Sequence, residues 1–258
     1  MRTKHLLLLS LAAIFCACVD WKGSDGERIE FSWRTASLCI EKPIAEGESR
    51  CYQIDLKLDT LAGDSLIARS LAKVLRDSVL CIQRNATIQE ALAAFADSIE
   101  TEWKAEIAEM YEPESEYNDM LQYYYTLEGK AVETGRDDVV SYMATTDCYL
   151  GGAHGSHVVL YYNFDIKSGK LLSIEDVVPA DKEEEMLRQM EEQLCKDWEA
   201  KDIAELRENT GITMLGDLYL TENFLLKEDS IEFLFNQYEI APYAAGLISV
   251  TIPSPANQ

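Results

Sequence analysis

Residues 139–170 read VVSYMATTDCYLGGAHGSHVVLYYNFDIKSGK, and this stretch does most to decide the fold. Residues 139–148 and 157–166 are rich in β-branched and aromatic residues and look like paired strands. A glycine-rich connection separates the two runs, and Ser168-Gly169 follows as a turn signal. The stretch therefore predicts two paired antiparallel strands.

The part of the chain before residue 139 predicts strands and helices. Residues 28–40 and 51–59 alternate like strands, whereas residues 64–81 and 88–110 carry apolar residues at helical spacing. The second helix begins with a capping box at Thr87, whose hydroxyl can accept from a free backbone N–H while Glu90 bonds back. Pro113 marks the expected end of this helix.

The part of the chain after residue 170 also predicts both a helix and strands. Residues 181–208 predict one long acidic helix with a buried stripe that includes Leu194 and Trp198, and three strands follow, over residues 218–226, 231–235 and 247–252. Runs of strands interrupted by runs of helices favour an α+β fold with largely antiparallel sheets packed with two to three helices.

The first residues predict export. Arg2 and Lys4 precede a compact apolar run, residues 6–15, and small Ala17 stands directly before Cys18. This order is typical of a lipoprotein signal, in which Cys18 receives the lipid after cleavage. An ordinary secretory signal cut near the same place stays open as an alternative. The apolar run is too short to cross a bilayer core.

Composition narrows the class of protein. The 258 residues are 47% hydrophobic, enough for a sizeable core. The leader carries two basic residues and no acidic one, so its removal takes the formal net charge from −23 to −25. Such a surface repels nucleic acid and would attract basic proteins, although the charge can also serve solubility alone.

Seven cysteines are present in a chain expected to be exported, where disulfides form. Cys39 and Cys51 flank a turn-rich segment and could bridge a hairpin, provided that a bulge near Ala36-Ser37 corrects the strand parity. The remaining cysteines are expected to be buried thiols, because their spacings do not suggest a zinc site.

Two short strings invite catalytic or metal interpretations. Gly63-Asp64-Ser65-Leu66 spells an esterase signature, but no histidine follows His157, so capping of a helix by Asp64 or Ser65 explains it better. In the connection after residue 150, His154 and His157 could bind a metal together with Asp147, or Gly152 could let a partner approach the backbone. A tight structural connection is the third interpretation, and no catalytic set is predicted.

A second distinctive loop covers residues 238–246, YEIAPYAAG. Tyr238 and Tyr243 could stack on a sugar ring while Glu239 bonds its hydroxyls. Alternatively, the loop is an ordered crossover stiffened by Pro242.

Three strings in this order, GGAHG at 151–155, YYNFDIKSGK at 161–170 and YEIAPYAAG at 238–246, resemble a known family of exported domains. It is the PdaC/RsiV-like domain of unknown function, shared by the non-catalytic region of a peptidoglycan deacetylase and by a lysozyme-sensing anti-sigma factor. The resemblance covers roughly residues 28–253. It implies a recognition module that is often carried by envelope lipoproteins.

We therefore expect a signal peptide over residues 1–17, a tether over 18–27 and two α+β regions that pack together, residues 28–150 (PdaC-like) and 151–258 (RsiV-like). The expected function is that of an envelope-anchored binding module for a lysozyme-like basic protein or for peptidoglycan. It needs no cofactor or metal. The predicted contact residues are His154, His157, Gly152, Tyr238, Glu239 and Tyr243. A hydrolase of envelope glycans and a structural lipoprotein remain alternatives.

Overall fold

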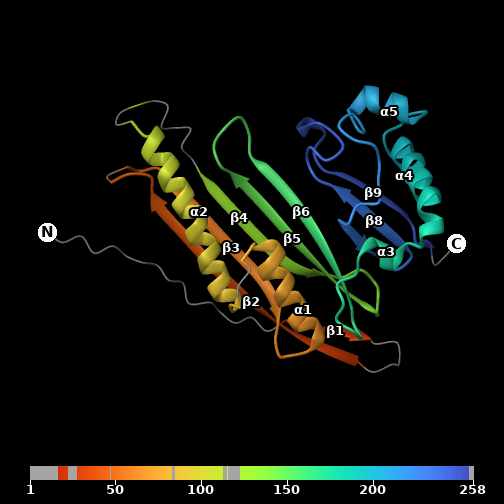
Figure 1. The fold of residues 1–258 in the computed structure, drawn as a ribbon, viewed down its shortest axis with the longest axis horizontal. Coiled ribbons are helices and arrows are strands. Elements are labelled where there is room, and N and C mark those ends of the chain that lie inside the picture. The colour runs from red at the N-terminus through yellow and green to blue at the C-terminus, as the bar shows by residue number, and fades with distance from the viewer. Residues whose placement is uncertain are drawn as a thin grey trace.

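A six-stranded sheet in the order β1-β2-β3-β4-β5-β6 forms the first half of the fold (Figure 1). The computed structural model describes residues 17–22, 28–46, 48–82, 85–112, 115 and 123–255, with side chains from Phe31 onward. Residues 1–16 of the predicted signal and Pro113 lie outside these ranges. The strands are Ala17–Lys22, Arg28–Pro43, Cys51–Leu61, Tyr124–Val132, Val139–Tyr149 and Ser156–Asp165.

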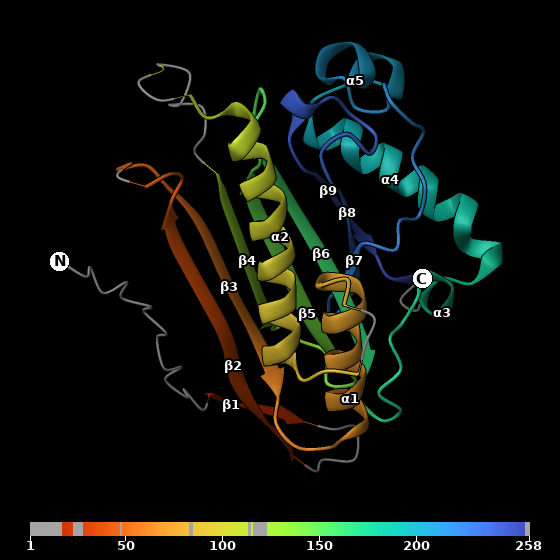
Figure 2. The same cartoon turned by 60° about the vertical axis from the view of Figure 1, so that its left-hand side comes forward.

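Neighbouring strands of this sheet are antiparallel except for β3 and β4, which run parallel. A parallel pair needs a long crossover connection. Here the crossover contains α1 (Leu66–Val74), a π-helical turn η1 (Leu75–Val79) and α2 (Ile88–Met110). Figure 2 shows α1 and α2 side by side across one face of the sheet.

Both predicted helix starts are confirmed. The Ser65 hydroxyl accepts from the backbone N–H of Ala68 at 3.2 Å, so this serine caps α1 rather than standing free as a nucleophile. At α2 the capping box is complete: the Thr87 hydroxyl accepts from the N–H of Glu90, and the Glu90 carboxylate accepts from the N–H of Thr87.

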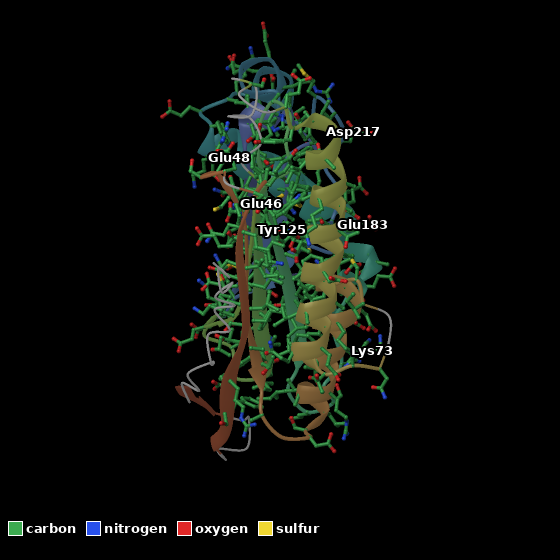
Figure 3. All side chains as sticks on the ribbon, turned by 90° about the vertical axis from the view of Figure 1, so that its left-hand side faces the viewer. Glu46, Glu48, Lys73, Tyr125, Glu183 and Asp217 are labelled. Atoms are coloured by element: carbon green, nitrogen blue, oxygen red, sulfur yellow. The ribbon has the colours of Figure 1, made fainter. Side chains whose placement is uncertain are left out.

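The first core lies between this sheet and the two helices. Alternate residues of β3 point toward the helices and are buried, namely Tyr52, Ile54, Leu56 and Leu58. Tyr125 of β4 lies between the sheet and α2 (Figure 3), where its ring meets that of Phe95 edge-on at 5.4 Å.

One carboxylate of α2 faces the core. Glu100 is only 7% exposed, and its Oε1 atom receives bonds from the Tyr52 hydroxyl at 2.6 Å, from Lys104 at 2.7 Å and from Lys42. Burial alone would raise the pKa of Glu100, but the bonds from Lys104, Lys42 and Tyr52 outweigh it and lower the pKa to about 2. Burial and the facing carboxylate raise the pKa of Tyr52.

A second, three-stranded sheet follows in the order β7-β8-β9, antiparallel throughout. Its strands are Phe224–Leu226, Ser230–Phe235 and Ile248–Pro253. A second core forms where α4 (Glu183–Asp197) and α5 (Ile203–Thr210) bury Met186, Met190, Leu194 and Leu206 against apolar residues of this sheet. The short α3 (Ile174–Val177) connects the two sheets.

The single long helix predicted over residues 181–208 is wrong, because the chain breaks between α4 and α5. Glu199 adopts a left-handed conformation with φ of 54°, which ends α4, and Asp202 restarts the chain by capping α5 through the N–H of Glu205. The break also turns Trp198 outward, so it is 45% exposed rather than part of the buried stripe. The strand predicted at 218–226 shrinks to β7.

The tether predicted over residues 18–27 is also wrong in part. Residues 17–22 form β1 and pair antiparallel with β2, so that Cys18 lies opposite Ser32 and Lys22 opposite Arg28.

The suggested Cys39–Cys51 disulfide is wrong. The β2–β3 ladder runs without interruption past Ala36, so the bulge that would have corrected the strand parity is absent from it. Cys39 lies opposite Asp55 and Cys51 opposite Pro43, four ladder positions apart, and both thiols are free.

The fold class is α+β with mainly antiparallel sheets, as predicted. We refer to residues 17–166 as the first lobe and to residues 172–255 as the second lobe. The change of sheet falls after Asp165 rather than at residue 150, because β6 pairs with β5 along its whole length. Within the described residues, every helix is too short or too polar to span a membrane.

Candidate functional site

The connection between β5 and β6 is a tight, exposed hairpin tip. Gly151 and Gly152 have φ of 86° and 90°, which only glycine adopts without strain, and Gly152 has open space around it. The Tyr149 hydroxyl closes the tip by donating to the carbonyl of Gly152 at 2.8 Å. Tyr149 also stacks on Tyr124 across the β4–β5 ladder, with ring centroids 6.4 Å apart.

His154 extends from this tip to the second lobe. Its imidazole stacks on the ring of Tyr243 at 3.7 Å, with an angle of 20° between the ring planes. Its Nε2 lies 3.1 Å from the hydroxyl of Tyr238, and its Nδ1 lies 3.0 Å from the carbonyl of Gly155. The fold therefore brings together three residues that the sequence analysis named from separate loops.

The two tyrosines stand on a well-anchored segment of the second lobe. Ile240 is fully buried beneath it, and the one-turn helix η4 (Tyr243–Ala245) follows Pro242. Tyr238 has φ of 69°, a left-handed conformation uncommon for a residue with a side chain, and this turn directs it outward. Tyr238 is 54% exposed and its ring lies 5.8 Å from that of Tyr243.

We define the aromatic surface as Tyr124, Tyr149, His154, Tyr219, Tyr238 and Tyr243. It lies at the end of the molecule where the β5–β6 tip meets the segment after β8 (Figures 1 and 2). Tyr124 and Tyr219 are 43% and 45% exposed, so rings from both lobes are open to a ligand. Large rings left in water on neighbouring loops are typical of recognition surfaces.

Two carboxylates flank the aromatic surface. Glu239 is exposed and held only by weak contacts, at 3.4 Å from Asn236 and at 3.5 Å from the Tyr219 hydroxyl. Asp147 accepts from Nδ1 of His157 at 2.5 Å, and both side chains stay largely in solvent. In the described part of the chain, neither carboxylate has a lysine or arginine partner.

The three-residue metal interpretation fails on this geometry. His157 faces Asp147, whereas both nitrogens of His154 are directed at Gly155 and Tyr238. Among the described residues, His, Cys, Asp and Glu side chains nowhere gather in a group of three that could hold a metal ion.

Side-chain amides fasten the two lobes beneath the aromatic surface. β6 is the edge strand of the first sheet, and its outward N–H groups recur at every second residue. Those of His157, Val159 and Tyr161 donate to the side-chain oxygens of Gln237, Asn236 and Asn223, at 3.3, 2.8 and 2.9 Å. Asn223 and Asn236 also donate to the carbonyl of Val159, at 2.8 and 3.1 Å.

A third asparagine completes this amide junction from the first lobe. Asn163 is buried, donates to the carbonyl of Phe224 at 2.7 Å and accepts from the N–H of Leu226 at 3.2 Å. The junction adjoins the aromatic surface in sequence as well as in space, because Asn236 and Gln237 directly precede Tyr238. It therefore fixes the position of Tyr238 relative to His154.

The sequence analysis did not identify Tyr124, Tyr149, Tyr219 or the junction amides. The run of tyrosines at 123–125 was the available signal for Tyr124. Its exposure, however, depends on the β4–β5 register and on α2 covering the opposite face. The polar residues Asn223 and Asn236 read as ordinary turn formers until the lobes are placed together.

Comparison with known proteins agrees with the sequence resemblance. Residues 175–254 match the family DUF3298, described as a protein of unknown function, and these residues make up most of the second lobe. The chain is 27% identical over 172 residues to the peptidoglycan-N-acetylmuramic acid deacetylase PdaC of Bacillus subtilis (strain 168). That match takes in 66% of this chain but only 35% of the deacetylase, so the chain spans about a third of the relative's length.

Two solved structures share the fold. A member of the DUF3298 family from Bacteroides fragilis NCTC 9343 superposes with a TM-score of 0.77 at 20% identity, covering 90% of this chain and 92% of that chain. A DUF3298 family protein from Pseudomonas aeruginosa PAO1 gives a TM-score of 0.61 at 19% identity, covering 86% and 90%. Residues 175–254 therefore match the DUF3298 family, within a chain that is similar in sequence to part of PdaC and shares its fold with solved DUF3298 family structures.

Proposed function

We propose that this protein is a binding module of the cell envelope and that the aromatic surface is its contact site. The observation that carries this proposal is the set of exposed rings contributed by both lobes around His154, Tyr238 and Tyr243. Rings of this kind supply large contact area at low entropic cost and contribute most where they cluster.

The envelope location rests on two observations. The first residues have the pattern of a lipoprotein signal ending at Cys18, and the relative in Bacillus subtilis acts on peptidoglycan according to its name. Two ligand classes suit the site: a cell-wall glycan, which would stack on the rings, and a basic protein of the lysozyme kind, which the acidic surface would attract.

Binding is tested with the mature chain, residues 18–258. Co-sedimentation with purified peptidoglycan and titration with lysozyme are each measured across a salt series. The double variant Tyr238→Ala/Tyr243→Ala should weaken binding at least about tenfold, because two ring contacts of hot-spot size are lost. Trp198→Ala is the matched control, since it removes an exposed ring elsewhere on the second lobe.

Each outcome decides something. Unchanged binding by a folded double variant would show that the contact surface lies elsewhere. If binding to lysozyme disappears at about 0.15 M salt, the interaction is non-specific electrostatic attraction, because salt screens interactions between exposed charges. Release of soluble glycan fragments would replace the binding module by a hydrolase.

Lipidation at Cys18 is tested separately in cells. Cys18→Ser should leave the unprocessed precursor in place of a lipid-labelled mature chain, because the lipid is attached to the thiol before cleavage. An unchanged mature product without label would favour the ordinary secretory signal.

A further inference from the structure

We propose that the aromatic surface selects an amine-bearing sugar, a hexosamine unit that has lost its acetyl group, over the acetylated form. This inference rests on the proposed function and adds the ligand class. It follows from the balance of charge and of hydrogen-bonding groups around the exposed rings.

The groups beside the rings are mostly acceptors with negative charge. The carboxylate of Glu239 can accept further hydrogen bonds, because its contacts with Asn236 and Tyr219 are long, at 3.4 and 3.5 Å. Asp147 adds a second carboxylate two residues before Tyr149 on β5, where it accepts from His157. A protonated amine has three donors and a positive charge, which suits this set of acceptors.

The aromatic rings also favour a protonated amine. A cation over the face of a tyrosine is attracted to it by the ring quadrupole, and the sugar carbons pack on the rest of the ring. An N-acetyl group carries no charge and offers one N–H donor where a protonated amine offers three, so it suits these acceptors less well. Anionic polymers would meet repulsion from Asp147 and Glu239.

A lysine-rich or arginine-rich protein is the competing occupant, but the arrangement favours the smaller ligand. The rings of His154, Tyr238 and Tyr243 pack on one another, with centroids 3.7 to 6.2 Å apart, and form one compact cluster whose extent matches a single sugar-sized group rather than a protein surface.

The test compares two ligands that differ only in acetylation, glucosamine tetramers and N-acetylglucosamine tetramers, by calorimetry at mildly acidic pH and about 0.15 M salt. We expect the amine form to bind about tenfold more tightly. Glu239→Gln should remove most of this preference while it retains ring stacking. Glu184→Gln, an equal charge change on the first turn of α4, should retain it.

The failures of the two proposals can be told apart. Equal or tighter binding of the acetylated tetramer would overturn the amine preference and leave a glycan-binding module. Binding of intact peptidoglycan or lysozyme, but of neither tetramer, would also overturn it while the proposed function stands. If none of these ligands binds, both proposals fall. If Glu184→Gln reduces the preference as much as Glu239→Gln, the effect is bulk charge and the site assignment is wrong.

Discussion

Glu100 makes a predictable contribution to the acid stability of this fold. Its pKa in the folded protein is about 2, against about 4.3 for an unperturbed glutamate. A folded-state pKa below the unfolded value means that the ionised carboxylate stabilises the fold at any pH above the unfolded value. This contribution is then lost as pH falls from about 4.5 toward 2. The shift corresponds to about 3 kcal/mol of unfolding free energy at neutral pH.

The substitution Glu100→Gln removes this charge with little change of shape. The Tyr52 hydroxyl can still donate to the new carbonyl, and Lys42 and Lys104 keep much of their side chains in solvent, so no cation is left stranded. We therefore expect a loss of about 2 to 3 kcal/mol at pH 7, which lowers the melting temperature by roughly 2–4 °C for each kcal/mol in a chain of this size.

The assay is urea denaturation of the wild type and of Glu100→Gln between pH 7 and pH 2. Other carboxylates titrate in the same range, so the informative quantity is the difference between the two unfolding free energies. That difference should shrink toward zero near pH 2, whereas Glu184→Gln on the exposed turn of α4 should show little difference at any pH. A difference between wild type and Glu100→Gln that stays constant with pH would refute the reasoning.

Three further predictions concern the fold. Asn236→Ala should cost about 1–3 kcal/mol, because the buried N–H of Val159 loses its acceptor, and hydrogen exchange should quicken at that amide; unchanged protection there would contradict the amide junction. Thr87→Ala removes the hydroxyl that accepts from the N–H of Glu90 and should cost about 1 kcal/mol in thermal unfolding, whereas Thr87→Ser should largely retain the cap. Gly129→Ala should destabilise the protein by about 1–3 kcal/mol, since an added Cβ would stand 2.6 Å from a methyl of Leu58 as well as against the Tyr142 hydroxyl; a stable variant would mean that the first core is looser than described.

The sequence predicts the elements of this fold where local chemistry dominates. The strands predicted over residues 139–148 and 157–166 and the capping box at Thr87 all appear in the structure, because each depends on neighbouring residues alone. The break between α4 and α5 was missed since the 3.6-residue pattern continues through it, although Asp202 and Glu205 carry a capping pair. The pairing of β1 with β2 was missed because a short polar segment reads as a linker.

The candidate site was only partly accessible from sequence. His154, Tyr238 and Tyr243 stood out as unusual residues in two loops, and the structure places them in contact. What brings them together is the docking of the second lobe on β6, and this depends on Asn223 and Asn236 finding backbone groups more than 60 residues away in the chain. Such long-range polar contacts leave no periodic signal.

The amide junction has a consequence for self-association. A strand at the edge of a sheet offers unpaired N–H and C=O groups to any other chain, and natural proteins need a means of hiding them. Here three side-chain oxygens occupy the outward N–H groups of β6, so the edge is closed without a seventh strand. The second lobe thus protects the β6 edge against strand-to-strand assembly, and the first lobe produced alone would expose β6 as a template for aggregation.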